Sequence, residues 1–193
     1  MTEAIKILQR EHDNIATVLA CLDYLVNDIG AGKLRPNFNL LYSILDYIEA
    51  FPESFHHPKE EDFIFEALSR RSTKGRALID RLRDEHAQGI DFLTKLRDTL
   101  TAYHKDASAF PSFRDVARAY IDFEYAHMQR EEEELLPLAE ESLKDEDWTE
   151  IDQAFARNDD PLFGLARGRR FQALYEQIQE GTRGGNIRAR ARF

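Results

Sequence analysis

Apolar residues recur at intervals of three and four along most of this chain, the spacing that one face of a helix produces. In the first segment this stripe runs from Ile5 to Val26 and stops at Gly30–Gly32, where glycine suits a helix C-terminus. A second segment starts near Pro36 and extends to about Leu68. The pattern therefore predicts two long helices in the first part of the chain.

Two prolines, Pro52 and Pro58, lie inside the second segment. A proline within a helix removes a backbone hydrogen bond and clashes with the preceding turn. We therefore expect a bend or a short break at this point.

Two further long helices are predicted from about Gly75 to Tyr103 and from about Pro111 to Leu143. Beyond Leu143 the pattern predicts only short helices, one opening at Asp147 and one around Phe171 to Ile178. The expected organisation is a four-helix unit over residues 1–143, a helical extension over 144–180 and a flexible basic tail over 181–193. The arginines of the predicted tail are Arg183, Arg188, Arg190 and Arg192.

Four of the six histidines fall on the apolar stripes, one on each long segment. They are His12, His56, His86 and His127, and the second and fourth are followed four residues later by Glu60 and Glu131. Residues four apart share one face of a helix, so each such pair directs an imidazole and a carboxylate toward one point. This half-pattern occurs twice, which indicates two equivalent helical hairpins packed around a common interior.

The six side chains form a donor set that suits a pair of metal ions. Imidazole and carboxylate groups are typical transition-metal ligands, and helical bundles build such sites from facing helices. Burying these groups without partners would be costly, and metal ions would remove that cost. A polar network that only fixes the helix packing is the alternative, and the repeated pattern favours the metal site.

His57 competes with His56 for the position on the second helix. Counting forward from His56 reproduces the sequence after His127, with a glutamate at +4 and an apolar residue at +8. Counting from His57 gives Glu61 at +4 but a poorer match beyond it. We therefore favour His56 with Glu60, and His57 is left as a group beside the site, an extra ligand or an exposed residue.

Composition narrows the classes of function. With 193 residues the chain can form one domain with a sizeable core, and its formal net charge of −10 argues against general nucleic-acid binding. Its single cysteine, Cys21, excludes a disulfide framework and a multi-cysteine zinc or iron–sulfur site. No apolar run approaches the length of a membrane span, and the N-terminus lacks the features of a secretory signal. We expect a cytoplasmic protein.

Four motifs together resemble the hemerythrin-like HHE cation-binding family: Glu11-His12-Asp13, HHPKEED from His56, Glu85-His86 and HMQREEEELLP from His127. The similarity covers about residues 3 to 143. It implies an up-down-up-down four-helix bundle, here followed by short C-terminal helices, and a non-haem di-iron centre, although other divalent metals would also suit the donors. It further implies that His12, His56, His86 and His127 are terminal ligands and that Glu60 and Glu131 bridge the two irons. Glu132 and Glu133 are expected on a solvated face.

One departure from the family bears on function. Oxygen-carrying hemerythrins have a second histidine four residues after the first on the third helix, and Ile90 stands there in this chain. A count of four histidines favours a protein that binds, senses or responds to dioxygen, peroxide or nitric oxide over one that stores oxygen. Iron handling under oxidative or nitrosative stress is one role consistent with this. A peroxide- or oxygen-consuming di-iron enzyme is the alternative, and a protein partner or a homo-oligomer is compatible with either.

Overall fold

The structure, a computed structural model, describes residues 2–156, 160–164 and 169–189. Within these ranges every regular element is helical and there is no strand. The all-α fold expected from the apolar spacing is therefore confirmed. In the described ranges, no helix is both long and apolar enough to cross a membrane.

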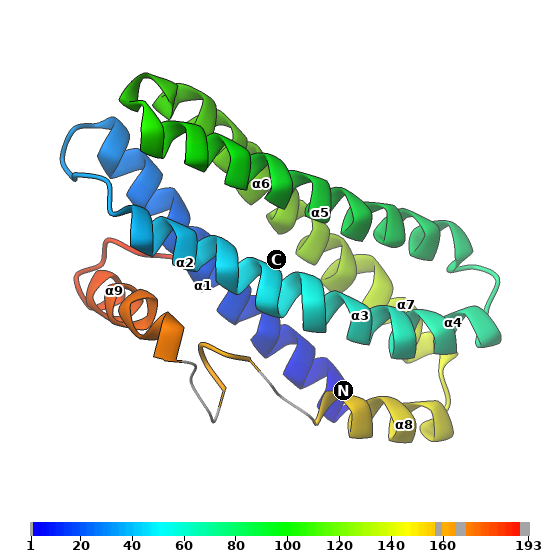
Figure 1. The fold of residues 1–193 in the computed structure, drawn as a ribbon. Coiled ribbons are helices and arrows are strands. Elements are labelled where there is room, and N and C mark those ends of the chain that lie inside the picture. Colours follow the sequence, from blue (N-terminus) through cyan, green and yellow to red (C-terminus); the bar gives the residue numbers. More distant parts are fainter. Residues whose placement is uncertain (1, 157–159, 165–168, 190–193) are drawn as a thin grey trace.

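Long helical segments lie side by side and build the body of the molecule (Figure 1). The first is α1 (Glu3–Gly30), which ends where Gly32 adopts a positive φ of 69°. The second is continuous in space but changes its helix type, as α2 (Phe38–Ile48), a π-helical segment (Glu49–His56), α3 (His57–Lys59), a π-helical segment (Glu60–Phe65) and α4 (Glu66–Arg71). The others are α5 (Arg76–Lys105), a 3-10 turn (Ala107–Ala109), α6 (Phe110–Arg130), a π-helical segment (Glu131–Leu135) and α7 (Leu136–Ser142).

The bend or break expected at Pro52 and Pro58 is replaced by wider helical turns. The chain stays helical, and the backbone N–H of His57 bonds to the carbonyl of Pro52, five residues back. A π-turn accommodates a proline because it redirects the hydrogen bonds that an α-helix would require. The wider turn also shifts the helical register by about one residue per turn, so neighbouring residues such as His56 and His57 can face the same interior.

Two apolar clusters fill the interior on either side of a polar layer. One contains Leu19, Leu45 and Leu96 with their neighbours, and the other contains Leu8 and Leu82 with theirs. Between the two, each long segment crosses the polar layer through its histidine and glutamate positions. The apolar clusters therefore hold the helices in a fixed relation around these side chains.

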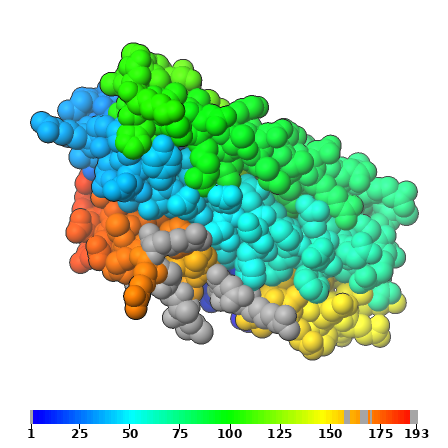
Figure 2. Space-filling model, in the orientation of Figure 1, coloured from blue at the N-terminus to red at the C-terminus, as the bar shows by residue number. Residues whose placement is uncertain are grey.

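The C-terminal part of the chain packs against the long helices. It comprises α8 (Asp145–Phe155), a 3-10 turn (Arg169–Phe171) and α9 (Gln172–Arg183). Figure 2 shows α8 in yellow and α9 in orange to red, lying against the blue to teal segments. The buried Asp160 joins this part to the core, since its carboxylate accepts hydrogen bonds from Asn14 and Tyr47.

The structure describes part of the segment that the sequence predicts to be a flexible tail. Helix α9 continues to Arg183, and Ile187 is buried against Gly181. Arg190, Arg192 and Phe193 lie outside the described residues.

Candidate metal centre

The structure brings all six predicted side chains into the polar layer. His12 comes from α1, His86 from α5 and His127 from α6, while His56, Glu60 and Glu131 lie at the ends of π-helical segments. No more than 5% of any of the six residues is exposed. Six side chains of types that can bind a metal, from distant parts of the sequence, are thus gathered at one buried place.

The side chains form two groups of a size that fits a metal ion each. The first group is His12, His56, Glu60 and Glu131, and the second is His57, Glu60, His86 and His127. Within each group the donor atoms lie within 4.8 Å of one another. Because Glu60 belongs to both, the two positions are adjacent and share a carboxylate.

Both glutamates span the two positions. Oε2 of Glu131 lies 3.2 Å from Nε2 of His12, while its Oε1 lies 3.3 Å from Nε2 of His127. Glu60 is placed in the same way, with Oε1 3.6 Å from Nε2 of His56 and Oε2 3.7 Å from Nε2 of His86. Each carboxylate can therefore offer one oxygen to each metal position.

His57 is the residue that the sequence left open. The structure places it with His56 in the site, buried and stacked on the ring of His86 at 4.2 Å. In an α-helix only one of the two histidines could face the site, because adjacent side chains point about 100° apart. The π-turns make both of them inward-facing, so the site contains five histidines.

A second set of carboxylates holds the outer nitrogens of four histidines. Each carboxylate comes from a helix next to that of its histidine, and the pairs are Glu11 with His56 (2.8 Å), Glu61 with His86 (2.7 Å), Glu85 with His127 (3.1 Å) and Glu132 with His12 (3.0 Å). In every pair the histidine uses Nδ1, which leaves Nε2 directed to the centre. Such partners fix the ring orientation of metal-binding histidines and strengthen them as ligands.

This outer set follows the same repeat as the ligands, and the sequence could have shown it. Glu11 and Glu85 each precede a histidine of the first helix of a hairpin, and Glu61 and Glu132 each lie five residues after a histidine of the second. The expectation that Glu132 is solvated is wrong, because only 7% of its side chain is exposed and it contacts His12. Glu133 is exposed, as expected.

Apart from their contacts with one another, the inward-facing atoms have no partner among the described residues. Nε2 of His12, His86 and His127 and both oxygens of Glu60 and Glu131 are buried without a hydrogen bond. Leaving such a group unpaired costs about 1–3 kcal/mol. Metal ions would use these lone pairs, so the residues fit a pair of transition-metal ions.

Comparison with known families agrees with this geometry. A family model described as the hemerythrin HHE cation binding domain matches residues 3–139. The chain belongs to this family. Comparisons with the curated proteins and with the solved structures returned no match. The protein therefore carries a hemerythrin cation-binding domain.

Protonation of the hemerythrin site in its metal-free form follows from burial and close charges. Burial lowers the pKa of His56 to about 4, so this imidazole is neutral and free to bind a metal. Burial and the nearby Glu131 raise the pKa of Glu60 well above its ordinary value of 4.5. Burial acts to raise the pKa of Glu131 as well, but His127 and His12 hold it well below 4.5. Metal binding is therefore expected to displace a proton from Glu60.

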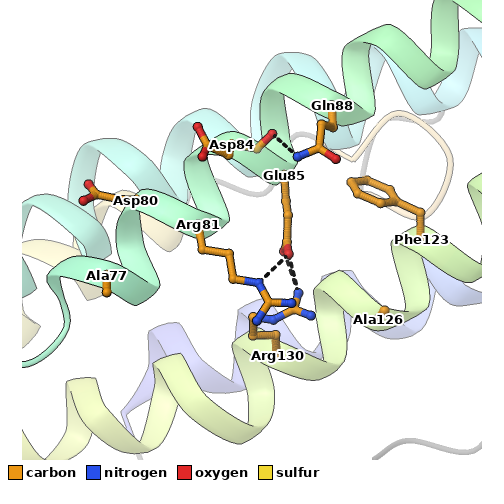
Figure 3. Close-up of a pocket in the computed structure, with 9 residues that line it drawn as sticks. All are labelled: Ala77, Asp80, Arg81, Asp84, Glu85, Gln88, Phe123, Ala126 and Arg130. Atoms are coloured by element: carbon orange, nitrogen blue, oxygen red, sulfur yellow. Dashed lines mark hydrogen bonds and ion pairs between the residues drawn. The ribbon is translucent and has the colours of Figure 1, made fainter.

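A groove between α3 and α5 lies beside the hemerythrin site. This cavity of about 400 Å³ is lined by His57 and His86, with Ile90 and Arg83 at its edge. A larger cavity of about 660 Å³ lies between α5 and α6, where Arg81 and Arg130 pair with Glu85 (Figure 3). None of the donors of the two metal positions lines the larger cavity. The groove is thus the more direct path for a small molecule.

A pair of buried carboxyl groups that no sequence pattern indicates, Glu53 and Glu124, lies beside the histidines. Each has an oxygen without a hydrogen bond, and both approach Gly89, where a Cβ atom would lie 3.0 Å from Glu53 and 3.6 Å from Glu124. The missing side chain at Gly89 therefore makes room for them. Burial and the neighbouring Glu124 raise the pKa of Glu53 to about 8.

Replacing Glu53 with glutamine is expected to stabilise the metal-free protein at alkaline pH. The folded state holds the Glu53 proton up to about pH 8, whereas the unfolded state releases it near 4.5, so wild-type stability falls between these values as pH rises. Glutamine removes this loss, which is about 1.4 kcal/mol per pH unit between the two pKa values, so we expect a gain of roughly 4 kcal/mol at pH 8 and less than about 1 kcal/mol at pH 5. Urea denaturation at both pH values measures the free energy of unfolding of the metal-free protein. Glu150→Gln, at an exposed position, is the control. An equal effect of Glu53→Gln at the two pH values would contradict the burial argument.

Proposed function

We propose that this protein is a non-haem di-iron protein, built on an up-down-up-down four-helix bundle, that binds dioxygen, nitric oxide or peroxide at the metal pair. The observation that carries the proposal is the pair of adjacent donor groups joined by Glu60, with their inward nitrogens and oxygens unpaired. Membership of the hemerythrin family supports the same conclusion. The ligands would be His12, His56, Glu60 and Glu131 at the first position and His57, His86, His127, Glu60 and Glu131 at the second.

The donor types support iron over softer metals. All are imidazole nitrogens or carboxylate oxygens, which suit iron, manganese and zinc. The single cysteine does not offer a thiolate ligand for a softer metal, because Cys21 is buried in an apolar cluster and burial raises the pKa of its thiol to about 12. Two carboxylates shared between the positions are the arrangement that holds a pair of like metals in helical bundles.

The two positions differ in the number of protein ligands they offer. The first has two histidines and the second has three, and both share the two glutamates. An iron pair supplies redox chemistry and coordination of small exogenous molecules, and the first position, with fewer protein donors, has more room for one. The chain orients the imidazoles through the outer carboxylates, excludes bulk water through the apolar clusters and admits small molecules through the groove beside His57.

The fifth histidine also bears on the role. A site with only four histidines would disfavour reversible oxygen storage. His57 is a fifth histidine in the site, so the number of histidines no longer disfavours oxygen storage. We therefore keep binding and sensing of small oxidants or nitric oxide as the proposed function, with oxygen storage no longer disfavoured. The cytoplasmic location, and the absence of nucleic-acid and membrane partners, stay predictions from the sequence. So does the division of the chain at residues 143 and 180.

Spectroscopic titration of the reduced, iron-loaded protein separates binding from turnover. The protein is kept anaerobic, and nitric oxide or dioxygen is then added to separate samples. Each ligand is expected to produce a new visible absorption band that saturates at about one ligand per metal pair. Removal of the gas would restore the starting spectrum if binding is reversible. Continued loss of hydrogen peroxide at a large stoichiometric excess would instead support the di-iron enzyme. No spectral response to any of the three would contradict both functions.

A further inference from the structure

The repeat that relates the two hairpins extends to a cation outside each metal position. Lys59 precedes Glu60 and Arg130 precedes Glu131, so the two cations occupy equivalent places. Nζ of Lys59 donates to Oε1 of Glu11 at 2.6 Å, and Nη1 of Arg130 donates to Oε2 of Glu85 at 2.6 Å. Each cation thus partners the glutamate that holds the outer nitrogen of a histidine on its own helix.

The surroundings of the two cations differ. Only 6% of the Lys59 residue is exposed, and its ammonium group lies between two aromatic rings, 4.7 Å from the centre of Phe55 and 4.4 Å from that of Phe155. Arg130 instead faces the open cavity between α5 and α6, where Arg81 also donates to Glu85 (Figure 3). A lysine is almost never buried to this degree without a specific partner.

One of the two rings over Lys59 comes from outside the matched domain. Phe155 is the last residue of α8, whereas the family match ends at residue 139. Helix α8 is fastened to the start of α1, since the backbone N–H of Ala4 donates to Asp152 at 2.7 Å. In Figure 2 the yellow atoms of α8 lie against the cyan to teal atoms of the second helical segment. The C-terminal extension therefore keeps the lysine away from water.

We propose that Lys59 is a positioning residue that controls the reduction potential of the metal held by His56, and that α8 isolates this control from solvent. The Lys59 ammonium group donates to Glu11 at 2.6 Å, and Glu11 accepts from the imidazole N–H of His56 at 2.8 Å. The positive charge of Lys59 therefore acts on His56 through Glu11. A carboxylate partner makes a histidine a stronger electron donor, and a cation on that carboxylate weakens the effect. In a dry interior the positive charge acts over a longer range than it would in water.

The sign of the effect follows from this chain of contacts. Without the lysine charge, Glu11 polarises His56 more strongly, and the oxidised metal is favoured. The reduction potential of the first position should therefore fall. The second position should be less sensitive to loss of Arg130, because Arg81 still pairs with Glu85 and water screens the site.

The test rests on the proposed di-iron centre and compares K59M, K59R and R130M in the full-length, iron-loaded protein. K59M keeps the length of the side chain and removes its charge. We expect two irons per chain, a lower potential for one iron in a spectroelectrochemical titration, and a shifted ferric absorption band. K59R should restore the wild-type potential, and R130M should give a smaller shift than K59M. The variant F155L keeps the lysine but opens it to water, so it should shift the potential in the same direction and by less.

Two results would overturn the inference while leaving the proposed function intact. One is a wild-type potential and spectrum in K59M with two irons bound, even if its thermal stability falls. The other is an unchanged reduction potential in F155L. This variant tests the inference even if K59M does not fold. A wild-type protein without two irons would instead refute the proposed function, and this inference with it.

Discussion

Replacement of Glu131 by alanine is expected to leave less than one metal ion per chain after iron-replete expression. The two oxygens of this carboxylate face opposite positions, 3.2 Å from His12 and 3.3 Å from His127. Its loss removes one donor from each position, and it removes the negative charge that would offset two cations in a buried site. Because both positions lose a ligand together, the expected product is a metal-free protein. Elemental analysis of the purified variant measures this directly.

Glu133→Ala is the matched control for this experiment. It removes a carboxylate two residues away on the same helix, and Glu133 is exposed and accepts a hydrogen bond from Gln129. We expect wild-type metal content in this variant. Two metal ions per chain in Glu131→Ala would refute the bridging role of this residue, and far-UV circular dichroism excludes loss of the helices as the cause of low metal content.

Removal of the metals is expected to lower the melting temperature of the protein by roughly 15–30 °C, because two bound ions together stabilise the folded state by about 8 kcal/mol. Ligands that bind only the folded state stabilise it by about 4 kcal/mol per site at a thousandfold excess over Kd. A change of 1 kcal/mol moves the melting temperature by about 2–4 °C in a chain of this size. The buried atoms of Glu60 and Glu131 that have no hydrogen bond explain why the metal-free state is the less stable one.

Calorimetry before and after dialysis against a chelator tests this expectation. Re-addition of ferrous iron under nitrogen should restore the original melting temperature. The metal-free Glu131→Ala variant should show no change on chelator treatment, which separates loss of metal from any direct effect of the chelator. Equal melting temperatures for the loaded and stripped wild-type protein would contradict a metal-binding role for the buried cluster.

Much of this arrangement could be predicted from the sequence because helix periodicity is a strong local signal. The apolar stripes predicted long helices, and the glycines after α1 marked its end. The repeated spacing of His56 with Glu60 and of His127 with Glu131 identified groups that the structure places together. Such patterns can be read from the sequence because the face of each helix that packs against its neighbours is apolar.

The sequence failed where the helix itself departs from the α form. His57 and His56 both face the site because π-turns alter the register, and no residue pattern except the internal proline signals those turns. The outer carboxylates were missed for a different reason. Glu132 looks like one member of an exposed acidic run, and its match to Glu61 in the repeat is the signal that sets it apart. Which histidine it bonds to depends on how its helix packs against α1. Contacts between helices are a property of the packing and cannot be read from one helix.

The C-terminal extension shows the same limit. Apolar spacing located α8 and α9, but the burial of Ile187 and the stacking of Phe155 over Lys59 depend on how the extension folds back. A glycine- and arginine-rich segment was therefore interpreted as a tail over its whole length, although part of it packs against the core.

The most direct test is the iron content of freshly purified wild-type protein together with its visible spectrum before and after azide. The di-iron assignment predicts about two irons per chain and a ligand-to-metal charge-transfer band that shifts when azide is added. Fewer than about one metal ion per chain after iron-replete expression, with no azide-sensitive band, would contradict it.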